Sequence, residues 1–364
     1  MTVLAATHAS PATLERAERD RLLVRFWLYA VLAVMFALFI VGGATRLSDA
    51  GLSITEWKPI HGLVPPMSQA QWREEFDKYK QIPEYRELNR GMSLGEFKTI
   101  FWWEYLHRVL ARGVGVLFAL PLAYFWLSGR IESGLGLRLT GLLLLGALQG
   151  AIGWWMVSSG LAERTDVSQY RLATHLLMAC IIFAATMAVA RGLAPHSAGP
   201  AGLGTRAFAG ALVVLVLAQI YLGGLVAGVD GGMSYNTWPL MDGRLVPPDL
   251  FVVEPAWRNF FENPKLVQFT HRCGAYVLLL AALAHMIATS VKEPGTTHAR
   301  RAALLFALVL LQAAVGVAAL VMQVPYGIAL AHQAMAIVVL GFAVAHWRGT
   351  KGSYLQPARV QPAL

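Results

Sequence analysis

Two short strings of the sequence pair a histidine with an arginine at the start of a long apolar run. Residues 104–108 read EYLHR and residues 268–272 read QFTHR. An imidazole can ligate a metal, and a guanidinium can bind a carboxylate through two parallel hydrogen bonds. Glu104 in the first string can relay protons or stabilise positive charge, whereas the second string has Gln268 in its place. The pattern predicts two related sites, of which only one carries an acid–base group.

Four of the ten histidines occupy equivalent positions in apolar runs. Each lies about one to two turns from the same end of its run, which at about 1.5 Å per residue predicts one shallow layer for all four. They are His107, His175, His271 and His332. Two imidazoles that face each other in a helix bundle are suited to axial ligation of a haem iron. The four histidines therefore predict two haem sites, one in each half of the chain.

Two other interpretations of these four histidines are weaker. A histidine within a membrane span is often only a hydrogen-bonded packing residue, but four at equivalent depths are harder to explain in this way. Zinc would need three or four ligands around one ion, and each half offers two histidines without a pair of carboxylates.

A stacked pair of haems across the membrane is the serious rival. His285 and His346 each follow a predicted ligand by fourteen residues, which is about 21 Å along a helix. That spacing is typical of b-type electron-transfer cytochromes. Against it, the first half has Pro121 and Val189 at the equivalent positions, and His346 lies at the cytoplasmic edge of its run.

The elements that must position these residues are membrane helices. The chain has 364 residues, of which 56% are hydrophobic and 14% are charged. Apolar stretches of about 18 or more residues indicate membrane spans. Eight occur, at about 26–44, 101–128, 139–158, 172–190, 207–229, 266–291, 302–324 and 326–347. The sequence predicts an all-α polytopic membrane protein with eight transmembrane helices arranged as two pseudo-symmetric four-helix bundles.

The positions of the basic residues predict the orientation in the membrane. Lysine and arginine gather before the first span, after the eighth, and between alternate pairs of spans, which places both termini in the cytoplasm. Segment 45–100 has eight basic and eight acidic residues and is expected outside. The +9 net charge forms no clustered patch, which argues against nucleic-acid binding. Cys180 and Cys273 both fall within spans, so no disulfide framework is expected.

The two halves of the chain repeat one design. Residues 42–66 read GGATRLSDAGLSITEWKPIHGLVPP, and residues 223–248 read GGLVAGVDGGMSYNTWPLMDGRLVPP. Further along, the pair Gln149 and Gly153 of the third span matches Gln312 and Gly316 of the seventh. Both halves begin on the same side, which indicates a parallel repeat about an axis along the membrane normal. A residue that is present in only one half therefore indicates that the two halves have different functions.

The charged residues beside the histidines allow two interpretations each. Glu104 lies three residues before His107 on the same helical face, where it can act on a bound group or merely pair with Arg108. Arg108 and Arg272 can bind haem propionates or extend to the outer interface.

Taken together, these motifs resemble the haem A synthase family, membrane enzymes that convert haem O to haem A for terminal oxidases. The resemblance runs from the first span to the eighth. It is carried by the 42–66 string, EYLHR, QFTHR and the histidines of ATHLL and AHQA. It implies that His107 and His175 flank haem O with Glu104 at the reacting methyl group, while His271 and His332 ligate haem b. One ring methyl would be hydroxylated twice and lose water to give a formyl group.

The resemblance also implies the surroundings of the protein. Expected partners are haem O, a haem O synthase, the lipid bilayer and an electron donor that the motifs do not identify. Some bacterial members carry cysteine pairs in the outer loops, and this chain has none there. The short N-terminus lacks a transit signal, so the expected location is a bacterial inner membrane, with the haem sites toward the outer side.

The predicted organisation follows from the repeat and the spans. It comprises a cytoplasmic tail (1–25), an N-terminal half with the substrate haem (26–192, including outer loop 45–100), a linker (193–206), a C-terminal half with haem b (207–348) and a second cytoplasmic tail (349–364).

Overall fold

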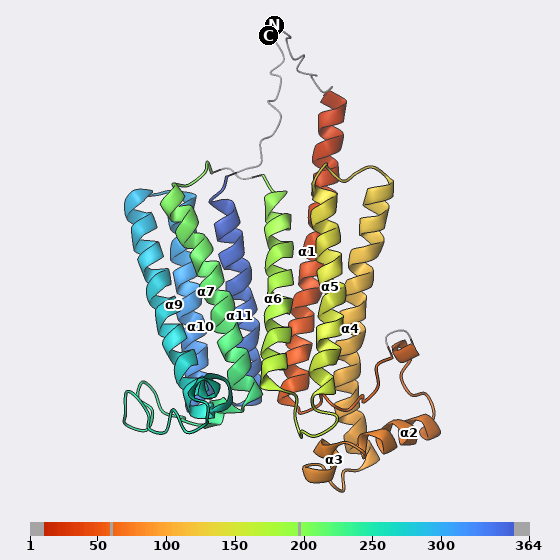
Figure 1. The fold of residues 1–364 in the computed structure, drawn as a ribbon. Coiled ribbons are helices and arrows are strands. Elements are labelled where there is room, and N and C mark those ends of the chain that lie inside the picture. Colours follow the sequence, from red (N-terminus) through yellow and green to blue (C-terminus); the bar gives the residue numbers. More distant parts are fainter. Residues whose placement is uncertain (1–10, 59–60, 196–197, 353–364) are drawn as a thin grey trace, which may run out of the picture.

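The computed structural model describes residues 11–58, 61–195 and 198–352, and nearly all of this chain is helical (Figure 1). Eight helices are long and apolar enough to cross a membrane. They are α1 (Pro11–Leu47), α4 (Leu94–Leu127), α5 (Leu135–Ser158), α6 (Gln169–Gly192), α7 (Leu203–Gly228), α9 (Pro264–Lys292), α10 (Thr297–Val321) and α11 (Tyr326–Gly349). The prediction of an all-helical protein with eight spans is confirmed for the described residues. Of the two predicted tails, residues 1–10 and 353–364 lie outside the described ranges, whereas residues 11–25 form the first part of α1.

The eight helices pack as two closed rings of four. In the first ring, α1 contacts α4 and α6, and α5 contacts both α4 and α6. In the second, α9 contacts α7 and α10, and α11 contacts the same two helices. The rings meet where α6 packs against α7 and α11 and where α1 packs against α11. Helices α4 and α6, which are the second and fourth spans, therefore stand at opposite corners of the first ring. Helices α9 and α11, which are the sixth and eighth spans, stand at opposite corners of the second.

The long connections lie at one end of the bundle, which we call the loop side. The first loop contains η1 (His61–Leu63), α2 (Gln69–Tyr79) and α3 (Pro83–Glu87), and the second contains η2 (Gly231–Met233), η3 (Ala256–Arg258) and α8 (Asn259–Glu262). Figure 1 shows α2 and α3 at the opposite end from the start of α1 and the end of α11. The four histidine-bearing helices all begin on the loop side.

Helix α4 begins at an earlier residue than its apolar run predicts, so it extends further out on the loop side. Ser93 caps it, because the Ser93 hydroxyl accepts from the Glu96 N–H while the Glu96 side chain accepts from the Ser93 N–H. Phe97, in this added segment, packs with Phe76 and Tyr79 of α2. His107 thus lies more than three turns into its helix, whereas the other three histidines lie within two turns of their helix starts.

One arginine joins the two rings on the loop side. Arg46, at the end of α1, pairs with Asp49 (Oδ1, 3.0 Å) and Asp166 (Oδ2, 2.8 Å) of its own half. The same guanidinium reaches Asp230 (Oδ1, 3.1 Å) and the carbonyl oxygen of Ala227 (3.0 Å) in the second half. Three carboxylates from three loops therefore converge on Arg46 and hold the halves together.

Candidate functional site

The Glu104 carboxylate is buried and held by three donors. Only 2% of its surface is exposed. Its Oε2 accepts from the Ser53 hydroxyl at 2.6 Å and from the Ile54 N–H at 2.7 Å, and its Oε1 accepts from Arg108 Nη2 at 2.6 Å. A carboxylate offers about four acceptor sites, so about one remains on Oε1 for another partner. Glu104 therefore does pair with Arg108, and one acceptor position of its carboxylate remains available for a reaction.

Arg108 holds the first loop beside α4. Its Nη2 also donates to the carbonyl oxygen of Ile54 at 2.8 Å, and its Nη1 donates to that of Glu56 at 3.2 Å. These hydrogen bonds hold the loop backbone beside Glu104, on the helix that carries His107.

The second half has the same arrangement of loop and helix, but the residue at the Glu104 position donates hydrogen bonds to the loop instead of accepting them. Gln268, also 2% exposed, donates through Nε2 to the carbonyl oxygens of Gly231 (2.8 Å) and Tyr235 (3.1 Å). Arg272 donates to the carbonyl oxygens of Tyr235 and Thr237, both at 2.9 Å, and to Gln268 Oε1 at 3.2 Å. The two arginines hold equivalent loop carbonyls, and the two residues at the Glu104 position differ in charge.

Each of the four predicted ligands lies against a glycine of an adjacent helix. A Cβ atom built on that glycine would lie 2.6–3.2 Å from the imidazole Cε1. The pairs are His107 with Gly42 (2.8 Å), His175 with Gly153 (3.0 Å), His271 with Gly223 (3.2 Å) and His332 with Gly316 (2.6 Å). Any larger residue would push the ring away, so glycine seats each imidazole directly on a helix backbone.

Glutamine side chains hold three of the four imidazoles. Gln149, Gln219 and Gln312 donate through Nε2 to the backbone carbonyl oxygens of His175, His271 and His332 at 2.9–3.0 Å. The same amide nitrogens lie 3.1–3.2 Å from Nδ1 of those rings. Each glutamine thus ties the backbone of one histidine to a neighbouring helix and places its amide nitrogen beside the ring.

The two histidines of each half come from opposite corners of one ring. His107 and His175 lie on α4 and α6 of the first ring, and His271 and His332 lie on α9 and α11 of the second. Two imidazoles from opposite helices of a four-helix ring, each seated on a glycine, fit the donor set of a haem iron. Within the described ranges, no three His, Cys, Asp or Glu side chains gather around a point that could hold a metal ion, which disfavours the zinc alternative.

Comparison with known proteins shows which family the chain resembles. A family model described as COX15-CtaA, cytochrome oxidase assembly protein, matches residues 25–344. Proteins named heme A synthase are similar over nearly their whole length. Those of Chelativorans sp. (strain BNC1) and Mesorhizobium japonicum are 66% and 64% identical over 354 and 346 residues, which is 97% and 95% of this chain and 98% and 95% of theirs. The chain belongs to the haem A synthase family.

In this member of the haem A synthase family, sequence reasoning missed the glutamine contacts. Gln149 and Gln312 were recognised only as matching repeat positions, and Gln219 was not recognised at all. The available signal was a glutamine four residues before three of the four seating glycines, Gly153, Gly223 and Gly316, which places both residues of each pair on one helix face. The contact itself depends on which histidine the neighbouring helix presents, and the spacing alone does not reveal it.

His285 and His346 lie closer to each other than two ligands of one iron would. Their Nε2 atoms lie 2.9 Å apart and both side chains are 1% exposed. Two imidazoles that share an iron hold their nitrogens about 4 Å apart, twice a metal–nitrogen bond of about 2 Å. The pair instead forms a buried hydrogen bond, with Phe208 packed edge-on against His285. This contact weighs against the stacked-haem alternative.

We expect His285→Ala to lower stability without changing the haem content. The substitution leaves His346 Nε2 buried without its partner, which costs about 1–3 kcal/mol. Thermal unfolding in detergent measures the first effect, and the haem-to-protein ratio measures the second. A variant that loses a haem b spectrum would revive the stacked-haem model.

A second buried carboxyl lies in the first outer loop. Glu84 of α3 is 4% exposed, and its Oε1 is 3.5 Å from Asn89 Nδ2. Among the described residues, its Oε2 has no hydrogen-bond partner. Burial, and next the negative charge of Glu104, raise the pKa of the Glu84 carboxyl to about 8. The folded loop therefore binds a proton at neutral pH that the unfolded loop releases near pH 4.5.

This proton predicts a pH dependence of stability. Between about pH 4.5 and 8 the folded state binds more protons than the unfolded state, so the contribution of Glu84 to stability falls as pH rises. Glu84→Gln removes this loss. We expect the variant to match wild type near pH 5 and to exceed its stability near pH 9 by at least about 1 kcal/mol. Melting curves of both proteins at several pH values measure the difference, and parallel curves would contradict the raised pKa.

Proposed function

We propose that this chain is a haem A synthase that oxidises one ring methyl of haem O to a formyl group. Two successive hydroxylations, each of which replaces a C–H hydrogen by a hydroxyl and takes its oxygen atom and its two-electron oxidant from outside the chain, give a geminal diol that loses water. The names of relatives 61–66% identical over almost the full length support this function. The membrane fold supports it as well, because both haem O and haem A are apolar molecules.

The difference between Glu104 and Gln268 carries the proposal. Both residues lie in one structural frame, tied to an outer loop and to the arginine four residues later. A carboxylate costs more to bury than a carboxamide, so its presence in one half only indicates a task there. We assign that task as proton acceptance from, or stabilisation of positive charge at, the reacting methyl carbon. His107 on the same helix then holds haem O together with His175.

The second half suits a resident haem b. His271 and His332 would be its axial ligands, and the bound group supplies electron transfer. The neutral Gln268 places no acid–base group beside it. Arg272 has a buried Nε without a hydrogen-bond partner in the described structure, so one N–H remains for a haem propionate. Arg108 occupies the equivalent place beside haem O.

The proposed setting is a bacterial inner membrane. The sites lie toward the loop side, which the distribution of basic residues assigns to the outer face, with both termini in the cytoplasm. A haem O synthase supplies the substrate, and a separate donor supplies electrons.

Analysis of the extracted haems tests the function. The protein is purified from cells that also express a haem O synthase, and its haems are separated by chromatography and identified by mass. We expect haem B together with haem O, its hydroxylated intermediate or haem A. Haem B alone, at two per chain and with no modified haem in the membranes, would mean an electron-transfer cytochrome.

A further inference from the structure

A glycine of α4 lies in the first half where the second half has a leucine. Gly115 follows His107 by eight residues. On α9, Leu279 follows His271 by the same number. Eight residues rise about 12 Å, so both positions lie about two turns deeper in the bundle than the imidazoles. Leu279 packs against the main hydrophobic core, whereas a Cβ atom built on Gly115 would meet no atom of the described structure within 4 Å.

The neighbouring helix of each ring repeats this difference. Gly146 of α5 precedes Gly153 by seven residues. At the equivalent place in α10, Val309 precedes Gly316 by seven residues. Because α5 and α10 run toward the loop side (Figure 1), both positions lie about 10 Å deeper than the seating glycines, close to the depth of Gly115. Val309 is 4% exposed and belongs to the core, whereas a Cβ atom on Gly146 would again meet nothing within 4 Å among the described residues.

Both glycines belong to helix faces that point into the first ring. Gly146 lies four residues after Leu142, which is 6% exposed, and three residues before Gln149, which reaches the histidine of α6. Gly115 lies three residues before Phe118, which is also 6% exposed. Yet both glycines are exposed. An exposed glycine on an otherwise buried face indicates open space inside the ring, which larger side chains fill in the second half.

The walls of this space are apolar. Residues 113–127 of α4 and 139–158 of α5 contain no charged side chain. Toward the end opposite the loop side, α4 and α5 approach each other closely, because a Cβ atom on Gly136 would lie 2.8 Å from the Trp126 ring. The space therefore lies between the imidazole layer and the contact of Trp126 with Gly136.

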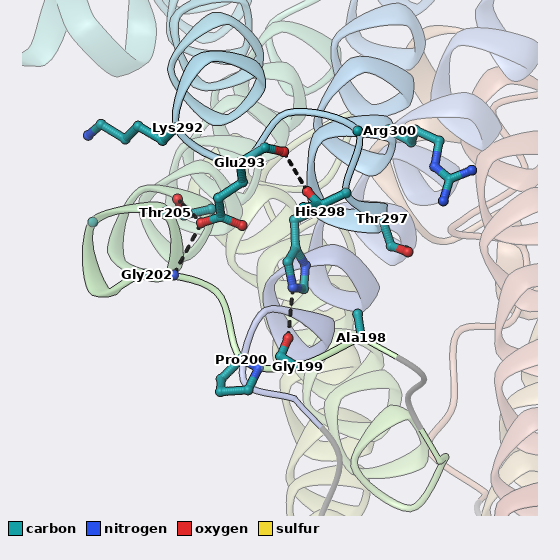
Figure 2. A pocket seen from close by; sticks show the side chains of 13 residues that line it. Ala198, Gly199, Pro200, Gly202, Thr205, Lys292, Glu293, Thr297, His298 and Arg300 are labelled. Carbon is teal, nitrogen blue, oxygen red and sulfur yellow. Dashed lines mark hydrogen bonds between the residues drawn. The ribbon is translucent and has the colours of Figure 1, made fainter.

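A pocket of the second ring, at the end opposite the loop side, has a different character (Figure 2). It lies where the α6–α7 connection meets the α9–α10 turn, and its lining includes Lys292 and Arg300. Glu293, also in the lining, accepts from the Gly202 N–H at 3.1 Å. Such a charged lining does not suit an apolar ligand, because the charged groups would lose their water without gaining partners.

The proposed function gives the two halves haems of different shape. Haem O carries a long isoprenoid chain where haem B carries a vinyl group, on the part of the ring away from the propionates. With Arg108 and Arg272 at the propionates on the loop side, the opposite edge of each haem points to the depth of Gly115 and Leu279. A chain attached at that edge needs apolar space in the first half, whereas a vinyl group in the second half does not.

We propose that Gly115 and Gly146 form a subsite for the isoprenoid chain of haem O, and that they let the first half select haem O over haem B. Leu279 and Val309 close the same place in the second half, so a haem fits there only without the chain. The inference rests on the proposed function, because it presumes that haem O is the substrate. It assigns the two glycines as residues that determine specificity.

Haem analysis of variants that carry the residues of the other half tests this proposal. Gly115→Leu and Gly146→Val give the first half the side chains of the second. Each protein is purified from cells that also express a haem O synthase, and haem O plus haem A per chain is measured by chromatography and mass. One surplus methylene in an apolar pocket lowers binding about tenfold or more, so each variant should hold at least about tenfold less of these haems than wild type. Haem B should stay at one per chain or more, because the second half is unchanged.

Gly113→Val is the matched control. Gly113 is exposed, and a Cβ atom there would have no neighbour within 4 Å in the described ranges. It lies two residues before Gly115, which turns it to the other side of α4, away from the ring. Its counterpart in the second half is Val277, six residues after His271 and 53% exposed. This variant should hold the same haems as wild type.

The outcomes separate this inference from the proposed function. Haem B alone in the wild-type protein would contradict haem A synthesis. Haem O and haem A at the wild-type level in both Gly115→Leu and Gly146→Val would overturn the subsite and leave the function in place. A loss of haem B equal to the loss of haem O would mean a general packing defect and would also overturn the selection. If either variant fails to assemble, Gly115→Ala or Gly146→Ala replaces it, and a haem O content equal to that of Gly113→Val would again overturn the subsite.

Discussion

Glu104→Gln should retain both haems and lose most product formation, by about 100-fold or more. A positioned acid–base group contributes about 10²–10⁴-fold to a rate, and the carboxamide cannot replace it. The carboxamide keeps one oxygen that accepts either from Arg108 or from Ser53 and Ile54, but its NH2 group faces the other donor, because Gln268 in the second half meets carbonyl oxygens where Glu104 meets donors. The haem content of the variant and a control that weakens the same contacts therefore separate the charge of Glu104 from its structural contacts.

The measurement combines the haem-to-protein ratio of the purified variant with the amount of haem A formed from haem O. Ser53→Ala is the matched control. It removes the hydroxyl that donates to Glu104 Oε2, while the Ile54 N–H and Arg108 still hold the carboxylate. We expect the control to lose less than tenfold. If Glu104→Gln loses haem and product equally, Glu104 has a structural role.

The fold could be predicted because membrane spans leave a strong signal in the sequence. Backbone polar groups have no water partner in a bilayer, so each apolar stretch of sufficient length must form a helix. Helix ends were predicted less well. The start of α4 at Leu94 depends on the cap formed by Ser93 and on the contact of Phe97 with α2, and neither is an apolar signal.

The sequence predicts which residues are candidate ligands, and it says less about the contacts that hold them in place. The repeat placed His107 and His271 at equivalent positions, and Glu104 against Gln268, without any coordinates. The hydrogen bonds from Arg108 and Arg272 to loop carbonyls were not predictable, because they depend on how each loop folds back onto its helix. The same holds for Arg46, whose partners come from three loops.

The contact between His285 and His346 illustrates the limit of spacing arguments. Both residues lie fourteen positions beyond a predicted ligand, which would suit stacked haems. The sequence cannot give the distance between α9 and α11 at that depth. In the structure the two imidazoles touch each other, although α9 and α11 stand at opposite corners of their ring.

His271→Ala should remove haem B from the purified protein and leave the substrate haem in place. Loss of a supporting residue alone costs about 10- to 100-fold in metal affinity, so loss of an axial ligand should cost more than about 100-fold. The helix packing should persist, because Gln219 donates to the backbone oxygen of residue 271 and that bond survives the substitution. Haem O should then accumulate in the variant, since electrons no longer arrive through the second half.

His175→Ala is the reciprocal variant, and it should lose haem O and haem A while keeping haem B. Gln149 likewise retains its bond to the backbone oxygen of residue 175. Chromatography and mass analysis of the haems in both variants decide between the models. Opposite losses in the two variants require two sites with different occupants. If each variant instead loses the same haem, the halves share one kind of site, and the charge of Glu104 cannot mark a substrate half.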